Sequence, residues 1–194
     1  MQKAIPFVLV GLSLVGIWLG MDLTDKHFQI VHQPELAFDS LCEVNETVSC
    51  SKVNGSKWSA IPLGGERAEL PVSVPGVGFY AMILLLALMA AFEERRRQKA
   101  LAWIALGAVP ALAFSLYLVF IQAFAVKAWC LFCLALDAVT VGTLAAAFVG
   151  HGGGVSGILA DVKEDTKLGL IAGVVILAVT GFNYSSYAGK VAKE

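Results

Sequence analysis

Long, almost unbroken runs of apolar residues alternate with short polar segments along this chain. Five of these runs approach the roughly 20 residues that a helix needs to cross the hydrocarbon core of a bilayer. They cover residues 4–21, 72–92, 100–126, 128–149 and 168–184. The pattern predicts an all-α membrane protein with five transmembrane helices and one long polar loop, over residues 22–71.

The first run has a second interpretation, as a secretory signal peptide, because Lys3 precedes it. The run is longer than the apolar core of about 7 to 15 residues that such peptides contain, and no clear Ala-x-Ala cleavage site follows it. We therefore expect a helix that remains in the mature protein.

Positive charge sets the expected orientation of the helices. The segment between the second and third runs reads Glu-Glu-Arg-Arg-Arg-Gln-Lys, and clustered Arg and Lys stay on the cytoplasmic side of a membrane. This places the amino terminus and residues 150–167 inside, and the loop 22–71 and the tail 188–194 outside. The third and fourth runs meet at Lys127 almost without a loop, at the outer surface.

The composition agrees with a membrane protein and excludes one class of partner. Hydrophobic residues make up 58% of the 194 residues, charged residues make up 15%, and the mean hydropathy is +0.76, which lies outside the range of soluble globular proteins. We expect a single integral membrane domain over residues 1–194. The net charge of -1 provides no basic excess for nucleic acid, and we expect no nucleic-acid partner.

Four cysteines form two pairs, and the predicted orientation places both pairs outside. Cys42 and Cys50 lie in the polar loop, whereas Cys130 and Cys133 form a Cys-Leu-Phe-Cys motif at the start of the fourth run. A loop pair that faces such a motif can pass dithiol electrons from a soluble protein into a bilayer, because exchange requires only a thiolate, a disulfide and access. A disulfide relay is our leading hypothesis.

The position of the Cys-x-x-Cys motif on its helix suggests a role for each sulfur. Cys130 lies near a helix amino terminus, where the helix dipole lowers the pKa of a thiol, and we expect it to exchange. Cys133 lies on the same face, about 4.5 Å deeper, and we expect it to meet a lipid-soluble electron acceptor. Phe132 either flanks that acceptor or belongs, like Trp129, to the aromatic belt of the interface.

Asp137 lies one helical turn beyond Cys133 on the same face, inside the fourth run. Ionisable residues at membrane depth are costly and mark functional sites by default. We expect a proton acceptor here, or a donor to a quinone carbonyl. The alternative is a carboxyl that a neighbouring helix satisfies, for example through Gln122.

Other interpretations of the cysteines stay open. Cys42 and Cys50 can form a static disulfide above two buried membrane thiols, in a scaffold or assembly factor without catalytic activity. They can also bind zinc together with His27 or His32, although the spacing matches no zinc-finger pattern. We expect no metal site, and we expect the loop pair to form an exposed, reducible disulfide.

The chain resembles the vitamin K epoxide reductase family, in its bacterial branch. The similarity rests on Cys42, the Ser-Cys-Ser-Lys-Val segment at 49–53, Ser56, Lys57 and Trp58, the Leu-Pro-Val-Ser-Val-Pro-Gly segment at 70–76, Phe79 and Tyr80, and the Cys-Leu-Phe-Cys motif at 130–133. Order and spacing both agree, and the similarity extends from the first helix through the fourth.

The resemblance implies a four-helix bundle around a quinone site, capped by the external loop, with a fifth helix beside it. By position, Cys42 and Cys50 correspond to the shuttle pair, and Cys130 and Cys133 to the pair that reacts with the quinone. Ser56 corresponds to the serine near the reactive centre, and Phe79 and Tyr80 border the quinone pocket. Helix packing is the alternative role for these two aromatic residues, and a turn hydroxyl for the serine.

The resemblance also implies an activity. We expect an enzyme, a thiol:quinone oxidoreductase of the bacterial inner membrane, that reoxidises a secreted thioredoxin-like disulfide oxidase and passes electrons to ubiquinone or menaquinone. Many bacterial relatives carry a fused thioredoxin-like domain, whereas this chain stops at Glu194, so we expect the partner to be a separate extracytoplasmic protein. The alternative activity is reduction of a quinone or vitamin K epoxide. Vertebrate members carry tyrosine where Asp137 falls, which argues against a pocket built for that epoxide.

Overall fold

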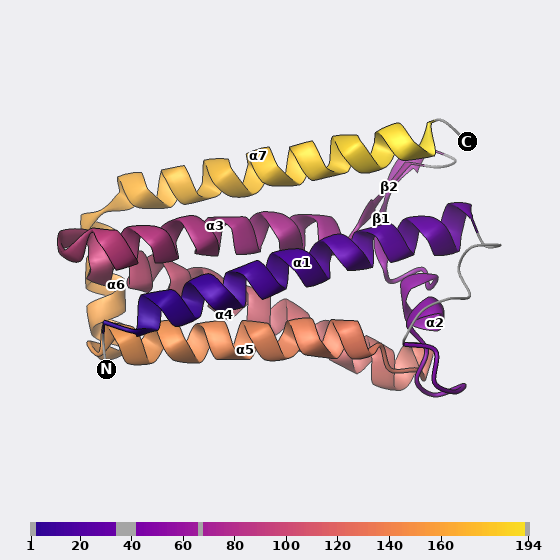
Figure 1. Cartoon of the computed structure of the whole chain (residues 1–194), viewed down its shortest axis with the longest axis horizontal. Helices are drawn as coiled ribbons and strands as arrows, with labels where there is room; N and C mark the ends of the chain where they lie inside the picture. Colours follow the sequence, from indigo (N-terminus) through magenta and orange to yellow (C-terminus); the bar gives the residue numbers. More distant parts are fainter. Residues whose placement is uncertain (1–2, 34–41, 66–67, 193–194) are drawn as a thin grey trace.

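Five long helices run side by side along the molecule in the computed structural model, which describes residues 3–33, 42–65 and 68–192 (Figure 1). They are α1 (Ile5–His32), α3 (Ser73–Phe92), α4 (Arg97–Phe120, continued by the π-helical turn Ile121–Val126), α5 (Leu131–His151) and α7 (Thr166–Val191). Within the described residues, each lies in a helical span that is long and apolar enough to cross a membrane. The prediction of an all-α membrane protein is confirmed.

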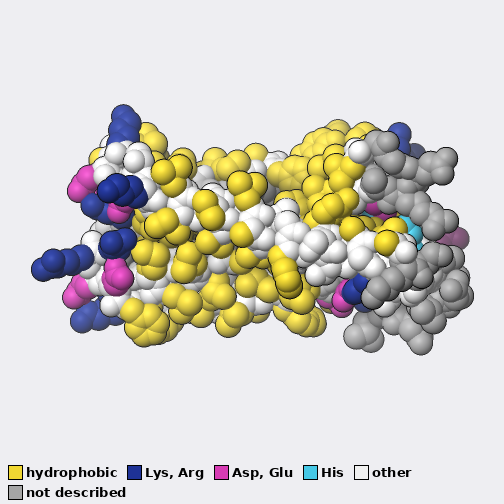
Figure 2. Space-filling model, turned by 90° about the horizontal axis from the view of Figure 1, so that it is seen from above, with side chains coloured by type: hydrophobic (Ala, Val, Ile, Leu, Met, Phe, Trp, Pro, Cys, Tyr) yellow, Lys and Arg dark blue, Asp and Glu magenta, His cyan; other side chains and the backbone are white. Residues whose placement is uncertain are grey.

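Helices α1, α3, α4 and α5 form a four-helix bundle, and α7 packs on the outside against α3 (Figure 1). Fully buried side chains from α1, α3 and α4 fill the bundle interior, among them Leu9, Ile83, Leu86, Leu101 and Ile104. Many apolar side chains of the same helices face outward instead. Figure 2 shows apolar side chains across the middle of the molecule on one face, with most of the visible Lys, Arg, Asp and Glu side chains at the end that carries the α3–α4 connection and fewer at the other end. This distribution is the one expected of a helix bundle in a bilayer.

Two glycines allow helices to approach α3 closely. A Cβ atom on Gly16 of α1 would overlap the ring of Tyr80, and one on Gly78 would lie 2.8 Å from the carbonyl oxygen of Ile176 on α7 and closer still to the Thr180 hydroxyl. The hydrophobic effect does not drive helix association in lipid. Small residues at such crossings stabilise the association instead, because they allow close van der Waals packing.

The polar loop contains more regular structure than the hydropathy pattern predicts. It holds the short helix α2 (Cys50–Asn54) and an antiparallel hairpin of β1 (Ala60–Gly65) and β2 (Ala68–Pro71). The 3-10 turn η2 (Glu94–Arg96) follows α3, and a helix in the connection that precedes α7, α6 (Gly154–Glu164), was not predicted either. Residues 34–41 and 66–67 of the predicted loop, and the last two residues of the predicted tail, lie outside the described residues.

Three helix boundaries differ from the prediction. The first helix was expected to end at Met21 but continues to His32, because Leu23, His27 and Phe28 bury one face against the loop although the segment is polar overall. The fourth helix begins at Leu131 rather than residue 128. The last runs over Thr166–Val191 rather than 168–184. Hydropathy marks the part of a helix that contacts lipid, and these helices extend beyond it.

A buried polar network ties the hairpin to α1 and α7. The Glu69 carboxylate lies 2.9 Å from Nε2 of His27 and accepts a 2.9 Å hydrogen bond from the Tyr187 hydroxyl. Nδ1 of His27 lies 2.8 Å from the backbone oxygen of Asn54 at the end of α2. The network therefore joins four elements of the cap.

We predict that Glu69→Gln destabilises the protein in a pH-dependent way. Burial raises the pKa of Glu69, but hydrogen bonds from His27 and Tyr187 outweigh burial and leave this pKa below its ordinary value. A carboxyl with a lowered folded pKa stabilises the fold above its unfolded pKa, and this contribution is lost as the pH falls through the folded pKa. We expect a loss of about 1 kcal/mol near neutral pH, measured by thermal unfolding. The difference from wild type should vanish in acid. A difference that does not change with pH would contradict a stabilising role for the ionised Glu69 carboxylate.

Candidate functional site

The loop cysteines form the expected disulfide at the capped end of the bundle. Cys42 and Cys50 are bonded, with their Cα atoms 5.5 Å apart. The expected exposure of this bond is wrong, because both side chains are buried in a cluster with apolar residues of α1, α2 and the segment before α5. Cys50 is the first residue of α2, whose N-cap Ser49 accepts a hydrogen bond from the backbone of Lys52. The short helix thereby fixes the direction in which the Cys50 sulfur points.

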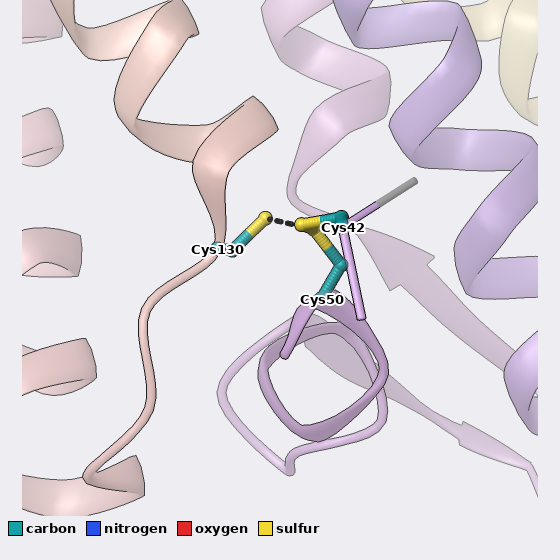
Figure 3. A group of neighbouring side chains, drawn as sticks. All are labelled: Cys42, Cys50 and Cys130. Carbon is teal, nitrogen blue, oxygen red and sulfur yellow. Dashed lines mark hydrogen bonds between the residues drawn. A yellow bond between two sulfur atoms is a disulfide. The ribbon is translucent and has the colours of Figure 1, made fainter. Parts of the chain in front are cut away.

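The two cysteine pairs meet at a single contact between sulfur atoms. Figure 3 shows Cys130 facing the disulfide, and its Sγ atom lies 3.3 Å from Sγ of Cys50. Backbone hydrogen bonds hold the loop against the segment before α5, from Ser49 to the oxygen of Trp129 at 3.0 Å and from Trp129 to the oxygen of Thr47 at 2.8 Å. Backbone hydrogen bonds therefore hold the two sulfur atoms close together, in addition to side-chain packing.

The chain turns sharply before Cys130 and exposes the amino terminus of α5 to its sulfur. Lys127 adopts a left-handed conformation with φ of 56°, and the Gln122 side chain accepts a 2.8 Å hydrogen bond from the backbone of Cys130. Cys130 is the N-cap of α5, and its sulfur accepts the backbone N–H of Cys133 at 3.2 Å.

These donors act on the acidity of Cys130. The hydrogen bond from the Cys133 thiol is the main cause that lowers the pKa of Cys130, with backbone N–H groups of α5 adding to it, and together they outweigh the burial that raises this pKa. A lower pKa increases the thiolate fraction, and the thiolate is the species that attacks a disulfide. Cys130 is thus both placed and activated for exchange with Cys50.

Cys133 lines a cavity of ≈ 430 Å³ inside the bundle. Apolar residues of α3 and α4 form much of the wall, and Pro110 and Ala111 contribute from the middle of α4. Of the residues predicted for a binding pocket, four lie on the wall together with Cys133: Ser56, Phe79, Tyr80 and Asp137.

The polar groups of the wall are fixed by hydrogen bonds. Ser115 of α4 donates to the Asp137 carboxylate, and the Tyr80 hydroxyl lies 2.8 Å from that of Thr140. A neighbouring helix therefore does contact Asp137, as the alternative role supposed, but through Ser115 and not through the example considered, Gln122, which accepts a hydrogen bond from the backbone of Cys130 instead.

Phe132 differs from the first of the two roles considered for it, whereas Ser56 agrees with both of its roles. Phe132 does not line the cavity and instead lies beneath Lys26, whose Nζ atom is 5.2 Å from the ring centroid. Phe132 immediately precedes Cys133 on α5, and adjacent helical residues lie on different faces, so Phe132 does not share the cavity with Cys133. The Ser56 hydroxyl donates a 2.7 Å turn hydrogen bond to the oxygen of Val53 and also lies on the cavity wall.

The arrangement of the cysteines and histidines argues against the zinc site considered from the sequence. In the part of the chain that the structure describes, Sγ atoms of Cys42, Cys50 and Cys130 lie within 4.8 Å of one another, and the group includes no histidine. His27 and His32 are directed to Glu69. The proposed ligand set of two cysteines and one histidine is therefore not assembled.

Several wall residues were missed by the sequence interpretation, namely His27, Asn54, Trp58 and Ser115. Asn54 follows Cys50 by four residues, which places it one helical turn away once the loop is known to be helical. Ser115 gave no signal, because a single hydroxyl in an apolar run is common in membrane helices.

Comparisons with known proteins agree with this geometry. The model of the vitamin K epoxide reductase family matches residues 7–148, which include all four cysteines and four of the five long helices. The chain is also 27% identical over 147 residues to vitamin K epoxide reductase complex subunit 1 of Mus musculus, covering 72% of this chain and 88% of the mouse protein. The chain is therefore an integral membrane protein that belongs to the vitamin K epoxide reductase family.

Proposed function

We propose that the protein is a thiol:quinone oxidoreductase, which takes two electrons from a thioredoxin-like protein outside the membrane and delivers them to membrane quinone. Family membership supports the coarser statement, a quinone-linked thiol oxidoreductase. The observation that carries the finer proposal is the 3.3 Å contact between Cys50 and Cys130, which joins a disulfide to a thiol pair at the edge of a cavity.

The first exchange of the proposed cycle takes place at the loop pair. A partner thiolate attacks Sγ of Cys42, the bond between Cys42 and Cys50 breaks, and Cys50 leaves as a thiolate. The second partner thiolate then attacks the partner sulfur of this mixed disulfide and displaces Cys42. The partner leaves as a disulfide, and Cys42 and Cys50 are left as a dithiol.

The second exchange uses the contact between the pairs. The Cys50 thiolate attacks Sγ of Cys130 in the inner disulfide, and Cys133 leaves as a thiolate. Cys42 then attacks Cys50 and displaces Cys130, so the loop disulfide forms again and the inner pair holds the two electrons. The structure corresponds to the end of this transfer, with Cys42 bonded to Cys50, and Cys130 and Cys133 free.

The cavity fits a quinone as the final acceptor, a substrate that accepts two electrons and two protons. Its wall is mainly apolar, as quinone rings and isoprenoid tails require, and it contains two buried polar atoms without a partner among the described residues, Nδ2 of Asn54 and Oδ2 of Asp137. Return of Cys130 and Cys133 to a disulfide releases two electrons and two protons next to this wall. Which quinone occupies the cavity depends on ring size and substituents.

The partner can be identified by trapping. In Cys50→Ala, Cys42 is a free thiol, so the partner is added in its oxidised form: the Cys42 thiolate attacks the partner disulfide, and the second partner cysteine leaves as a thiolate. Without Cys50 to displace the partner, we expect the mixed disulfide on Cys42 to accumulate. Cys42→Ala is the matched control, because Cys50 lies against Cys130 and resolves the bond internally. Capture of a thioredoxin-like protein by Cys50→Ala supports the proposal, and equal capture by both variants contradicts the order of exchange.

We propose that both pairs face the outside of a bacterial inner membrane, and labelling tests this orientation. Val44, beside the loop disulfide, and Gln98, at the other end of the bundle, are both exposed to solvent. In a background without the native cysteines, Val44→Cys should react with a membrane-impermeant maleimide added to intact cells, and Gln98→Cys should react only after lysis. The reverse pattern would place the cysteine pairs in the cytoplasm.

Asp137 is proposed to handle protons during quinone reduction. We expect Asp137→Asn, which keeps the size of the side chain and its contact with Ser115, to lower quinone turnover several-fold, on the order of the smaller general acid–base effects. Part of the pH dependence of turnover should disappear with it. Exchange between the loop pair and a dithiol, which occurs elsewhere, serves as the internal control. An unchanged pH profile in a folded variant would leave Asp137 as a helix-packing residue.

The similarity to the mouse protein supports a second candidate, reduction of a quinone epoxide through the same cysteines. The two activities differ in substrate and product. A thiol:quinone oxidoreductase converts a quinone to a hydroquinone, whereas an epoxide reductase converts a quinone epoxide to a quinone. Assay of the purified protein with vitamin K epoxide and with quinone, under the same reductant, distinguishes them.

A further inference from the structure

The amide nitrogen of Asn54 is a hydrogen-bond donor that no described residue satisfies. Asn54 is only 7% exposed, it lies on the wall of the cavity, and its Nδ2 atom has no hydrogen-bond partner in the part of the chain that the structure describes. An amide that is buried without a partner loses the hydrogen bonds that it makes to water, which is unfavourable. Such an atom in a ligand cavity indicates that the ligand completes the hydrogen bond.

The backbone of Asn54 is held in place by two buried side chains. Its carbonyl oxygen lies 2.8 Å from Nδ1 of His27 and accepts a 2.6 Å hydrogen bond from the hydroxyl of Ser59. His27 is anchored in turn by Glu69. The backbone that carries the donor is therefore held in place before any ligand enters, which reduces the entropy cost of binding.

The chemistry of the wall defines what the donor recognises. The cavity is mainly apolar, and an uncharged amide placed in it suits an uncharged acceptor such as a ketone oxygen better than an anion. Its position four residues after Cys50, on the same short helix, places the donor at the end of the cavity near the cysteines.

We propose that Asn54 binds the quinone, donating its side-chain N–H to a carbonyl oxygen of the oxidised ring. The proposal rests on the proposed function, since it assigns a binding residue for the same quinone. Asn54 acts in recognition, and His27 and Ser59 act as positioning residues that hold it.

The direct test is quinone affinity, measured without turnover. Trp58 lies on the same wall, so quenching of tryptophan fluorescence by a short-chain menaquinone or ubiquinone reports binding. Asn54→Leu has similar volume without the donor, and Asn54→Ala avoids any clash should leucine prevent folding. We expect each to raise the Kd roughly 3- to 10-fold, the loss of one neutral hydrogen bond.

Asn183 of α7, which is not a wall residue, supplies the matched control, and Asn183→Leu should bind with wild-type affinity. A second readout is the infrared stretch of a carbonyl-labelled quinone, which should shift to higher frequency in the Asn54 variants when the donor is lost. An unchanged Kd and an unchanged carbonyl band in Asn54→Ala would overturn the assignment of Asn54. Failure of the wild-type protein to bind either quinone would instead overturn the proposed function.

Discussion

Cys133→Ala should abolish quinone reduction. Without Cys133, Cys130 has no partner with which to form the inner disulfide, so two electrons have no route out of the thiol pair. We expect the rate of hydroquinone formation to fall below roughly one hundredth of the wild-type rate, because thiol–disulfide chemistry needs both sulfurs. The measurement is quinone absorbance during turnover by the purified variant.

The same variant should keep its outer chemistry. The contact between the pairs is made by Cys50 and Cys130 and does not include the Cys133 sulfur, so the loop disulfide should still exchange with a soluble dithiol at close to the wild-type rate. Leu131→Ala is a suitable control, since Leu131 begins the same helix but is 47% exposed and does not line the cavity. Quinone reduction by Cys133→Ala at more than about a tenth of the control rate would remove Cys133 from the mechanism.

Cys130→Ala should stop the relay one step earlier. This change removes the sulfur that lies 3.3 Å from Cys50, and no other route joins the pairs in the proposed cycle. With excess dithiol, Cys42 and Cys50 should accumulate as thiols, whereas in wild type with quinone they should remain mainly oxidised. Mass tagging of thiols after an acid quench measures the difference.

This result also separates a relay from a scaffold. A protein whose cysteines form static staples should show one redox state under all conditions, and Cys130→Ala should not change the state of the loop pair. Rapid reoxidation of Cys42 and Cys50 by quinone in this variant would show that electrons bypass Cys130. Both outcomes contradict the order of transfer proposed for the two pairs.

The architecture was predicted from the sequence because lipid imposes it. An apolar run long enough to cross a bilayer has to be helical, so hydropathy locates all five long helices. It does not locate their polar ends. The extension of α1 to His32 and the helix α6 each bury only one face. Because many residues in these segments are polar, their mean hydropathy does not mark them as helices.

The cysteine pairs were predicted, but the identity of the contact was not. Sequence spacing places Cys130 at a helix start, yet only the pairing of Val48 with Trp129 shows that Cys50 rather than Cys42 lies nearest to it. The same limit applies to the wall of the cavity. Asn54 and His27 lie in segments that appear irregular or polar in sequence, and their role depends on hydrogen bonds across the fold.

The misplacement of Phe132 has a related cause. The same sequence is compatible with an aromatic side chain that faces a cavity and with one that faces a neighbouring helix. Here Cys133 lines the cavity, whereas Phe132 contacts Lys26 of α1. Side-chain direction in the first turn of a helix follows from the cap geometry, which sequence alone does not provide.

The transfer of electrons through both pairs is tested most directly by stoichiometry in a reconstituted membrane. The purified protein, placed in liposomes that contain menaquinone or ubiquinone, is mixed with a reduced thioredoxin-like protein, and partner disulfide and hydroquinone are both measured. We predict one hydroquinone for each partner disulfide in the wild-type protein. In Cys130→Ala, we predict no hydroquinone and no more than one partner disulfide for each protein molecule. Oxidation of the partner without reduction of quinone, or quinone reduction that persists without Cys130, would contradict the relay.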